Sequence, residues 1–159
     1  MFGLFKKKNH ADDAHAKALE ILKEIGALKT LALLHKEALL GNVSDSEIND
    51  LVLGAYRTVT IGAGITVSIM KQLNTPREES SKAYWSFIND SSIRKIASSL
   101  FESLQEHVTI DMPASVMETE ADNLIKSGFK VHNHYMSNNI ESASSEWLLG
   151  AKGVKADSR

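Results

Sequence analysis

Cysteine is absent from this sequence of 159 residues, and its absence excludes several kinds of chemistry. A chain without thiols has no disulfide framework, no thiolate nucleophile, and no zinc or iron–sulfur site held by cysteine. Internal repeats are missing as well, which argues against a solenoid. The remaining composition, with 43% hydrophobic and 24% charged residues, is typical of one globular domain.

A strong excess of charge of one sign is also lacking. The formal net charge is -2 and the isoelectric point is about 6.3, so the chain as a whole does not attract polyanions. The segment from Ser91 to Leu104 resembles a recognition helix in length, but Arg94 and Lys95 are its only basic residues. We therefore expect no nucleic-acid partner.

No hydrophobic run long enough to span a membrane is free of interruptions. The segment from Leu51 to Met70 comes nearest, but it contains Tyr56, Arg57, three threonines and three glycines. This composition predicts a buried element of the fold and not a membrane span.

The N-terminal residues Phe2, Leu4 and Phe5 precede three lysines, which reverses the charge order of a secretory signal. We therefore expect a cytoplasmic protein, in which these three apolar residues could give weak peripheral contact with an anionic membrane. The expected organisation is a flexible leader over 1–10, a single helical domain over 11–150, and a flexible tail over 151–159.

Apolar residues recur at steps of three and four between residues 11 and 40, which predicts an amphipathic helix. Gly26 is expected to bend or divide this helix, and Gly41 is expected to end it. The apolar face is wide enough to meet more than one neighbour. The positions expected to point inward are Ala14, Ala18, Ile21, Leu22, Ile25, Leu28, Ala32 and Leu39.

A second helix is predicted to begin near Asp45, because Ser44 and Glu47 have the spacing of a capping box. Its end is ambiguous. Residues 59–69 alternate between apolar and small or polar side chains, which is the period of a strand. Two interpretations stay open: a long buried helix, which we favour, or a hairpin over 58–69.

In the helical interpretation, small residues four positions apart form one line along the helix. We call this line the small-residue ridge, and it consists of Gly54, Thr58, Gly62 and Thr66. Such a ridge lets another helix approach closely, so we predict that it is an interaction surface. Leucine at Gly62 is expected to overpack the contact, whereas alanine is expected to be nearly neutral.

Further helix boundaries are predicted by capping residues. Thr75 is expected to cap a helix whose first residue is Pro76, and Ser91 is expected to cap the next. Pro113 marks another start, and Gly128 is expected to stop that helix. Residues 129–135 then look extended, and a last helix begins near Ile140. The predicted fold is therefore all-α, a bundle of about five to six helices with a short extended segment over 129–135, or α+β if the hairpin forms.

His132 and His134 are the best candidate metal ligands. Two positions apart in an extended segment, their imidazoles would share one face and could share a metal ion. A third ligand is needed, for which His107, Asp111 and Glu120 are candidates. Solvated loop histidines are the simpler interpretation, so we expect no cofactor.

No catalytic nucleophile and no phosphate-binding loop is apparent in the sequence. The leading hypothesis is therefore a non-enzymatic helical module that binds a protein partner or forms a homo-oligomer. The alternative is a metal-dependent helical-bundle enzyme that uses His132 and His134.

Overall fold

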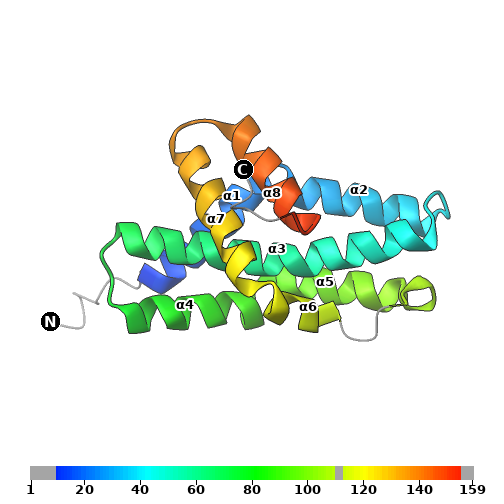
Figure 1. Cartoon of the computed structure of the whole chain (residues 1–159), viewed down its shortest axis with the longest axis horizontal. Helices are drawn as coiled ribbons and strands as arrows, with labels where there is room; N and C mark the ends of the chain where they lie inside the picture. Colours follow the sequence, from blue (N-terminus) through cyan, green and yellow to red (C-terminus); the bar gives the residue numbers. More distant parts are fainter. Residues whose placement is uncertain (1–9, 110–112, 155–159) are drawn as a thin grey trace, which may run out of the picture.

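The computed structural model describes residues 10–109 and 113–154, and these residues form an all-α bundle, as predicted (Figure 1). The predicted leader residues Phe2, Leu4 and Phe5 and the candidate ligand Asp111 lie outside the described residues. The helices are α1 (His10–Glu24), α2 (Ala27–Leu39), α3 (Asp45–Gln72), α4 (Arg77–Asp90), α5 (Ser92–Ser103), the 3₁₀ turn η2 (Gln105–His107), α6 (Pro113–Thr119), α7 (Ala121–Met136) and α8 (Ile140–Ala151).

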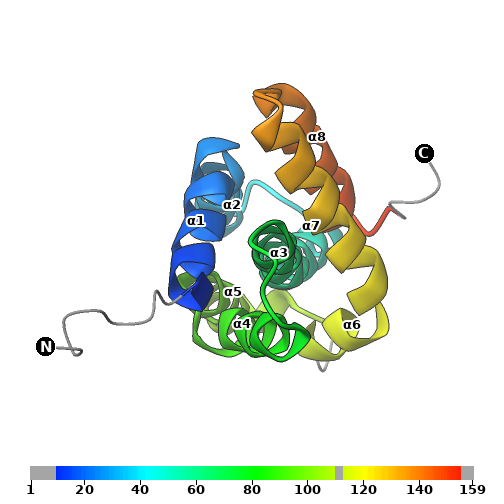
Figure 2. The same ribbon diagram turned by 90° about the vertical axis from the view of Figure 1, so that its left-hand side faces the viewer.

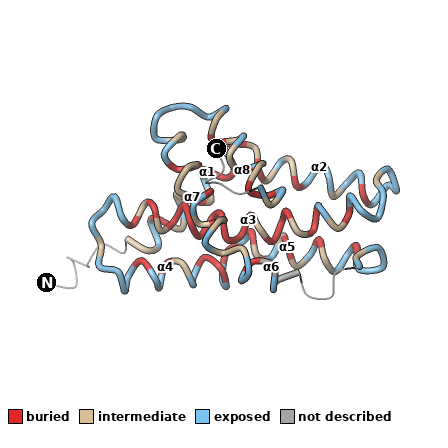
Figure 3. The backbone as a smooth tube through the Cα atoms, viewed as in Figure 1, coloured by how far each residue is buried: buried red, intermediate tan, exposed pale blue. Residues whose placement is uncertain are grey.

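Helix α3 is the centre of the bundle. Seen end-on, it is surrounded by α1 and α2 on one side, α4 and α5 below, and α6 to α8 on the other side (Figure 2). It packs against every other α-helix of the described residues. It is also long and apolar enough to span a membrane, but 78% of its most apolar window is buried by its neighbours (Figure 3). Residues 51–70 are thus the buried element that the sequence predicts.

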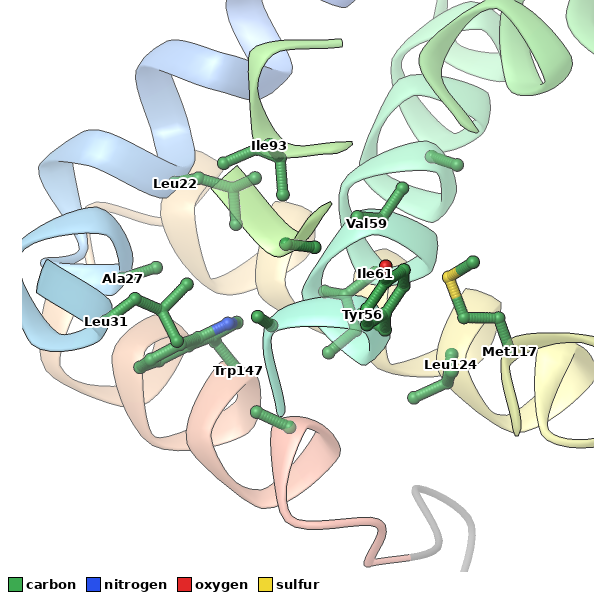
Figure 4. Close-up of a cluster of buried hydrophobic side chains, with 14 of the residues drawn as sticks. Leu22, Ala27, Leu31, Tyr56, Val59, Ile61, Ile93, Met117, Leu124 and Trp147 are labelled. Atoms are coloured by element: carbon green, nitrogen blue, oxygen red, sulfur yellow. The ribbon is translucent and has the colours of Figure 1, made fainter. Parts of the chain in front are cut away.

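The core forms around α3 because each surrounding helix turns an apolar stripe toward it. Figure 4 shows part of this cluster, to which all eight α-helices of the described residues contribute. Its largest fully buried side chains include Phe87, Ile21, Leu22, Ile61, Ile93 and Leu124.

The predicted capping box is confirmed. The Ser44 hydroxyl accepts a hydrogen bond from the backbone N–H of Glu47, and the Glu47 carboxylate accepts one from the backbone N–H of Ser44. Ser91 likewise caps α5, because its hydroxyl accepts from the N–H of Arg94 at 3.2 Å. These short-range interactions depend only on residues three apart, so they are visible in the sequence.

Gly26 divides the first predicted helix into α1 and α2. It adopts a φ of +83°, which glycine reaches without a steric penalty. The division shifts the apolar stripe of α2 by one residue from the expected phase. Leu39 is therefore 60% exposed and Ala32 is exposed, whereas Ala27, Leu31 and Ala38 are buried.

Residues 58–69 are entirely helical, so the hairpin alternative is wrong and the favoured long helix is confirmed. The strand-like alternation arises because α3 is buried on nearly all sides, so its apolar residues need not follow the period of a helix. The small residues between them admit close helix contacts.

The predicted stop at Gly128 and the extended segment over 129–135 are wrong, because α7 continues through both to Met136. Gly128 serves a different purpose. A Cβ atom placed there would lie 2.7 Å from the backbone nitrogen of Ile65 and 2.8 Å from the carbonyl carbon of Gly64. The glycine is therefore needed where α7 crosses α3 backbone to backbone.

Two other boundaries differ from expectation. Helix α4 begins at Arg77, with Pro76 as its N-cap, and the Thr75 hydroxyl donates instead to the carbonyl oxygen of Met70 at 3.0 Å. The helix that begins at Pro113 is interrupted at Glu120, where α6 gives way to α7. The break at Glu120 and the break at Gly26 explain why the described residues form more helices than the five to six expected.

Candidate functional site

The predicted metal ligands do not come together. Because 129–135 is helical, the side chains of His132 and His134 lie about 160° apart around the axis of α7 and do not share a face. His107 lies elsewhere, with its Nδ1 atom 3.1 Å from Asp45 Oδ1. No group of three or more potential ligands that could hold a metal ion is found among the described residues.

His132 instead forms a buried pair with Ser68 of α3. The Ser68 hydroxyl lies 2.7 Å from His132 Nδ1, and these residues are 6% and 2% exposed. Burial, assisted by the positive charge of Lys17, lowers the pKa of His132 below its ordinary value of 6.5. The neutral imidazole therefore joins α7 to α3 inside the bundle, where neither side chain is accessible to solvent to any large extent.

This pair predicts a pH dependence of stability. In the unfolded chain His132 titrates near its ordinary pKa of about 6.5, whereas in the folded chain its pKa is lower. Between these two pKa values the unfolded chain binds more protons at His132 than the folded chain does. The free energy of unfolding therefore falls as pH drops below about 6.5. His132→Gln should remove this component, and urea unfolding across the acidic range measures it. The exposed His107 provides the control, since His107→Gln should keep the slope contributed by His132. Equal pH slopes for the wild type and His132→Gln would contradict the prediction.

The small-residue ridge does admit close helix contacts, but with helices of the same chain. Gly54 lies against Ala151 of α8, and a Cβ atom at Gly62 would overlap the Phe87 ring of α4. Thr58 accepts a hydrogen bond from the Trp147 indole at 3.0 Å. All four ridge residues are buried, so the ridge is covered by helices of its own chain.

A groove with a volume of about 420 Å³ lies between α2, α3 and α8. Leu31 and Leu34 of α2, Leu51 of α3, and Trp147 and Leu148 of α8 give it apolar walls. Figure 4 shows Leu31 and Trp147 facing one another between α2 and α8. Leu34 and Leu148 are 43% and 39% exposed, so the apolar surface reaches the solvent.

The charged residues of the groove carry both signs. The Arg57 guanidinium makes intramolecular contacts: it pairs with Glu120 at 2.7 Å and donates a hydrogen bond to the carbonyl oxygen of Ala151 at 3.3 Å. With Arg57 neutralised by Glu120, the remaining lining charges are Glu47 and Asp50 on α3 and Lys152 after α8. The α3 wall is thus acidic.

Beside the groove, α2 exposes leucine on its outer surface. Leu33, Leu39 and Leu40 are 54%, 60% and 62% exposed. Leu33 and Leu40 are seven positions apart and so lie on the same side of the helix, where large exposed apolar side chains are candidates for contact with another molecule. The sequence signal was the wide apolar face of the first predicted helix, but the groove residues themselves could not be identified from it.

No protein-family model, curated protein or solved structure matches this chain.

Proposed function

We propose that this protein is a self-association module, in which α2 of a second copy docks into the groove between α2, α3 and α8. The observation that carries the proposal is the exposed leucine surface of α2 beside an open apolar groove. Covering both at once removes apolar surface from water, which is the main favourable term in protein association.

The outer face of α2 complements the groove in charge as well as in hydrophobicity. Lys29, Leu33, Lys36 and Leu40 are spaced four, three and four apart, so they form one stripe along the helix. All four are exposed. The leucines of this stripe match the apolar walls, and its lysines match Glu47 and Asp50 on the acidic α3 wall.

The arrangement also favours a closed dimer. Helix α2 is both a wall of the groove and the helix that would dock, so the two surfaces are adjacent on one chain. Two copies related by a two-fold axis can therefore exchange the same contacts, which closes the assembly and prevents a filament.

The direct test is Leu33→Glu and Leu40→Glu, measured by size-exclusion chromatography with light scattering over a range of concentrations. Each substitution places a charge against apolar surface twice per dimer, so the dimer dissociation constant should rise at least about 100-fold. Leu73→Glu is the matched control, because Leu73 is 44% exposed but follows the far end of α3. A monomer at every concentration would refute the proposal, as would a dimer equally insensitive to all three changes.

Exchanging the charges of Lys36 on α2 and Asp50 on α3 tests whether these two surfaces face each other in the dimer. Lys36→Glu should weaken the dimer because it faces the acidic α3 wall of the other copy, and adding Asp50→Lys to the same chain should recover part of the loss. The expected change is about 3- to 10-fold for surface charges of this kind. No recovery in the double variant would show that these two residues do not face each other.

A further inference from the structure

A second cleft lies toward the opposite end of α3 from the groove, and it is lined by residues of α3, the α3–α4 loop, α4 and α7. Its volume is about 550 Å³, which falls within the range of roughly 300 to 1,000 Å³ found for small-molecule sites. Val67 of α3, the Tyr84 ring of α4 and Ile125 of α7 give it an apolar interior. None of these residues contributes to the groove, so the two sites can be tested separately.

The charges that line this cleft are both positive. They belong to Lys71 at the end of α3 and Arg77 at the start of α4, and no carboxylate lines the cleft. Lys71 lies over the Phe129 ring at 5.1 Å, and neither cation forms an ion pair within the described residues. Both cations line the cleft without a carboxylate partner, so their N–H donors are available to a ligand.

Hydroxyl groups supply further polar contacts beside the two cations. Thr75 and Ser80 lie 3.2 Å apart and are joined by a hydrogen bond, and Ser81 lines the same wall. The Tyr84 pKa is raised by burial and by the charge of Asp122, so this hydroxyl stays protonated and able to donate. Asp122 disfavours an anion near Tyr84, which directs the acidic group of a ligand toward Lys71 and Arg77.

We propose that the cleft between α3, α4 and α7 binds a small amphipathic anion, with its acidic group at Lys71 and Arg77 and its apolar body against Val67, Tyr84 and Ile125. A guanidinium and an ammonium can bind the oxygens of either a carboxylate or a phosphate monoester. The apolar walls require that the acid be attached to a hydrocarbon body and exclude a fully hydrated ion.

The experiment is a titration of the full chain followed by two-dimensional amide NMR spectra. Sodium octanoate and octyl phosphate should each give saturable shifts at residues 67–84 and around Ile125. Octan-1-ol, which lacks the charge, and inorganic phosphate, which lacks the apolar body, should each bind at least about tenfold more weakly. Tighter binding of octanoate assigns the site to carboxylates, and tighter binding of octyl phosphate assigns it to phosphate monoesters.

Substitutions distinguish binding in the cleft from nonspecific attraction of anions to positive charges on the surface. Lys71→Gln with Arg77→Gln should weaken octanoate binding at least about tenfold while leaving octan-1-ol binding unchanged. Lys82→Gln with Lys95→Gln is the matched control, since it removes the same charge from exposed positions that do not line the cleft. The proposal is overturned if both pairs weaken binding equally, if octan-1-ol binds as tightly as octanoate, or if the shifts map to the groove between α2 and α8.

Discussion

Alanine at Gly128 should destabilise the protein by about 3 kcal/mol or more, although alanine favours a helix by up to about 1 kcal/mol over glycine. The added methyl group would overlap the carbonyl oxygen of Ile61 and lie 2.7 Å from the nitrogen of Ile65. Both are backbone atoms of the central helix, so no side-chain rotation can relieve the overlap. Helices α3 and α7 would have to move apart, which opens the core around them.

Two further substitutions test whether backbone contact is the cause. Gly64→Ala should be similarly harmful, because its Cβ would lie 2.8 Å from the carbonyl oxygen of Ile125. Gly54→Ala on the same helix should be neutral or slightly stabilising, because its nearest neighbour, the oxygen of Ala151, would lie 3.5 Å away. Chemical unfolding measures all three. If Gly128→Ala is as mild as Gly54→Ala, the two backbones do not meet as closely as the structure shows.

Leucine at Gly62 should have the other large effect, with a loss of about 3 kcal/mol or more. A Cβ atom at this position would already overlap the fully buried Phe87 ring and lie 3.1 Å from Leu22 Cδ1. The expectation from the sequence that alanine is nearly neutral here is therefore revised. Gly62→Ala should cost about 1 to 3 kcal/mol, because the ring it meets is enclosed.

A double-mutant cycle identifies Phe87 as the cause of that cost. Phe87→Leu alone leaves unfilled space and should cost about 1 to 3 kcal/mol, but it also removes the ring atoms that meet the new methyl group. The double variant should therefore be more stable than the sum of the single effects predicts, by about 1 kcal/mol or more. Additive effects in thermal or chemical unfolding would mean that the ring does not limit residue 62.

The starts of α3 and α5 follow from the sequence alone, because they depend on contacts within one turn. Ser44 with Glu47 and Ser91 with Arg94 cap helices through atoms three residues apart. The spacing predicts these two pairs, but it does not suffice everywhere, because the Thr75 hydroxyl donates to Met70 of the preceding helix and does not cap α4. The positive φ of Gly41 at the end of α2 is equally local.

The tertiary structure decided the roles of Gly128 and of the two histidines of α7. A glycine is used both where φ is positive and where two backbones meet, and the sequence cannot distinguish Gly26, which divides a helix, from Gly128, which continues one. Helix α7 could be recognised only once α3 was known to cross it there. With α7 helical, His132 meets Ser68 and no longer shares a face with His134.

The exposed surface of α2 was likewise decided by packing and not by the local sequence pattern. The apolar residues of 27–39 are enough to predict a helix, but their phase changes at Gly26, and that change decides which leucines enter the core. Only the packing of α2 against α3 and α8 leaves Leu33 and Leu40 in solvent and opens the groove beside them. The local pattern therefore determines that this segment is a helix, and long-range packing determines which of its faces another molecule can reach.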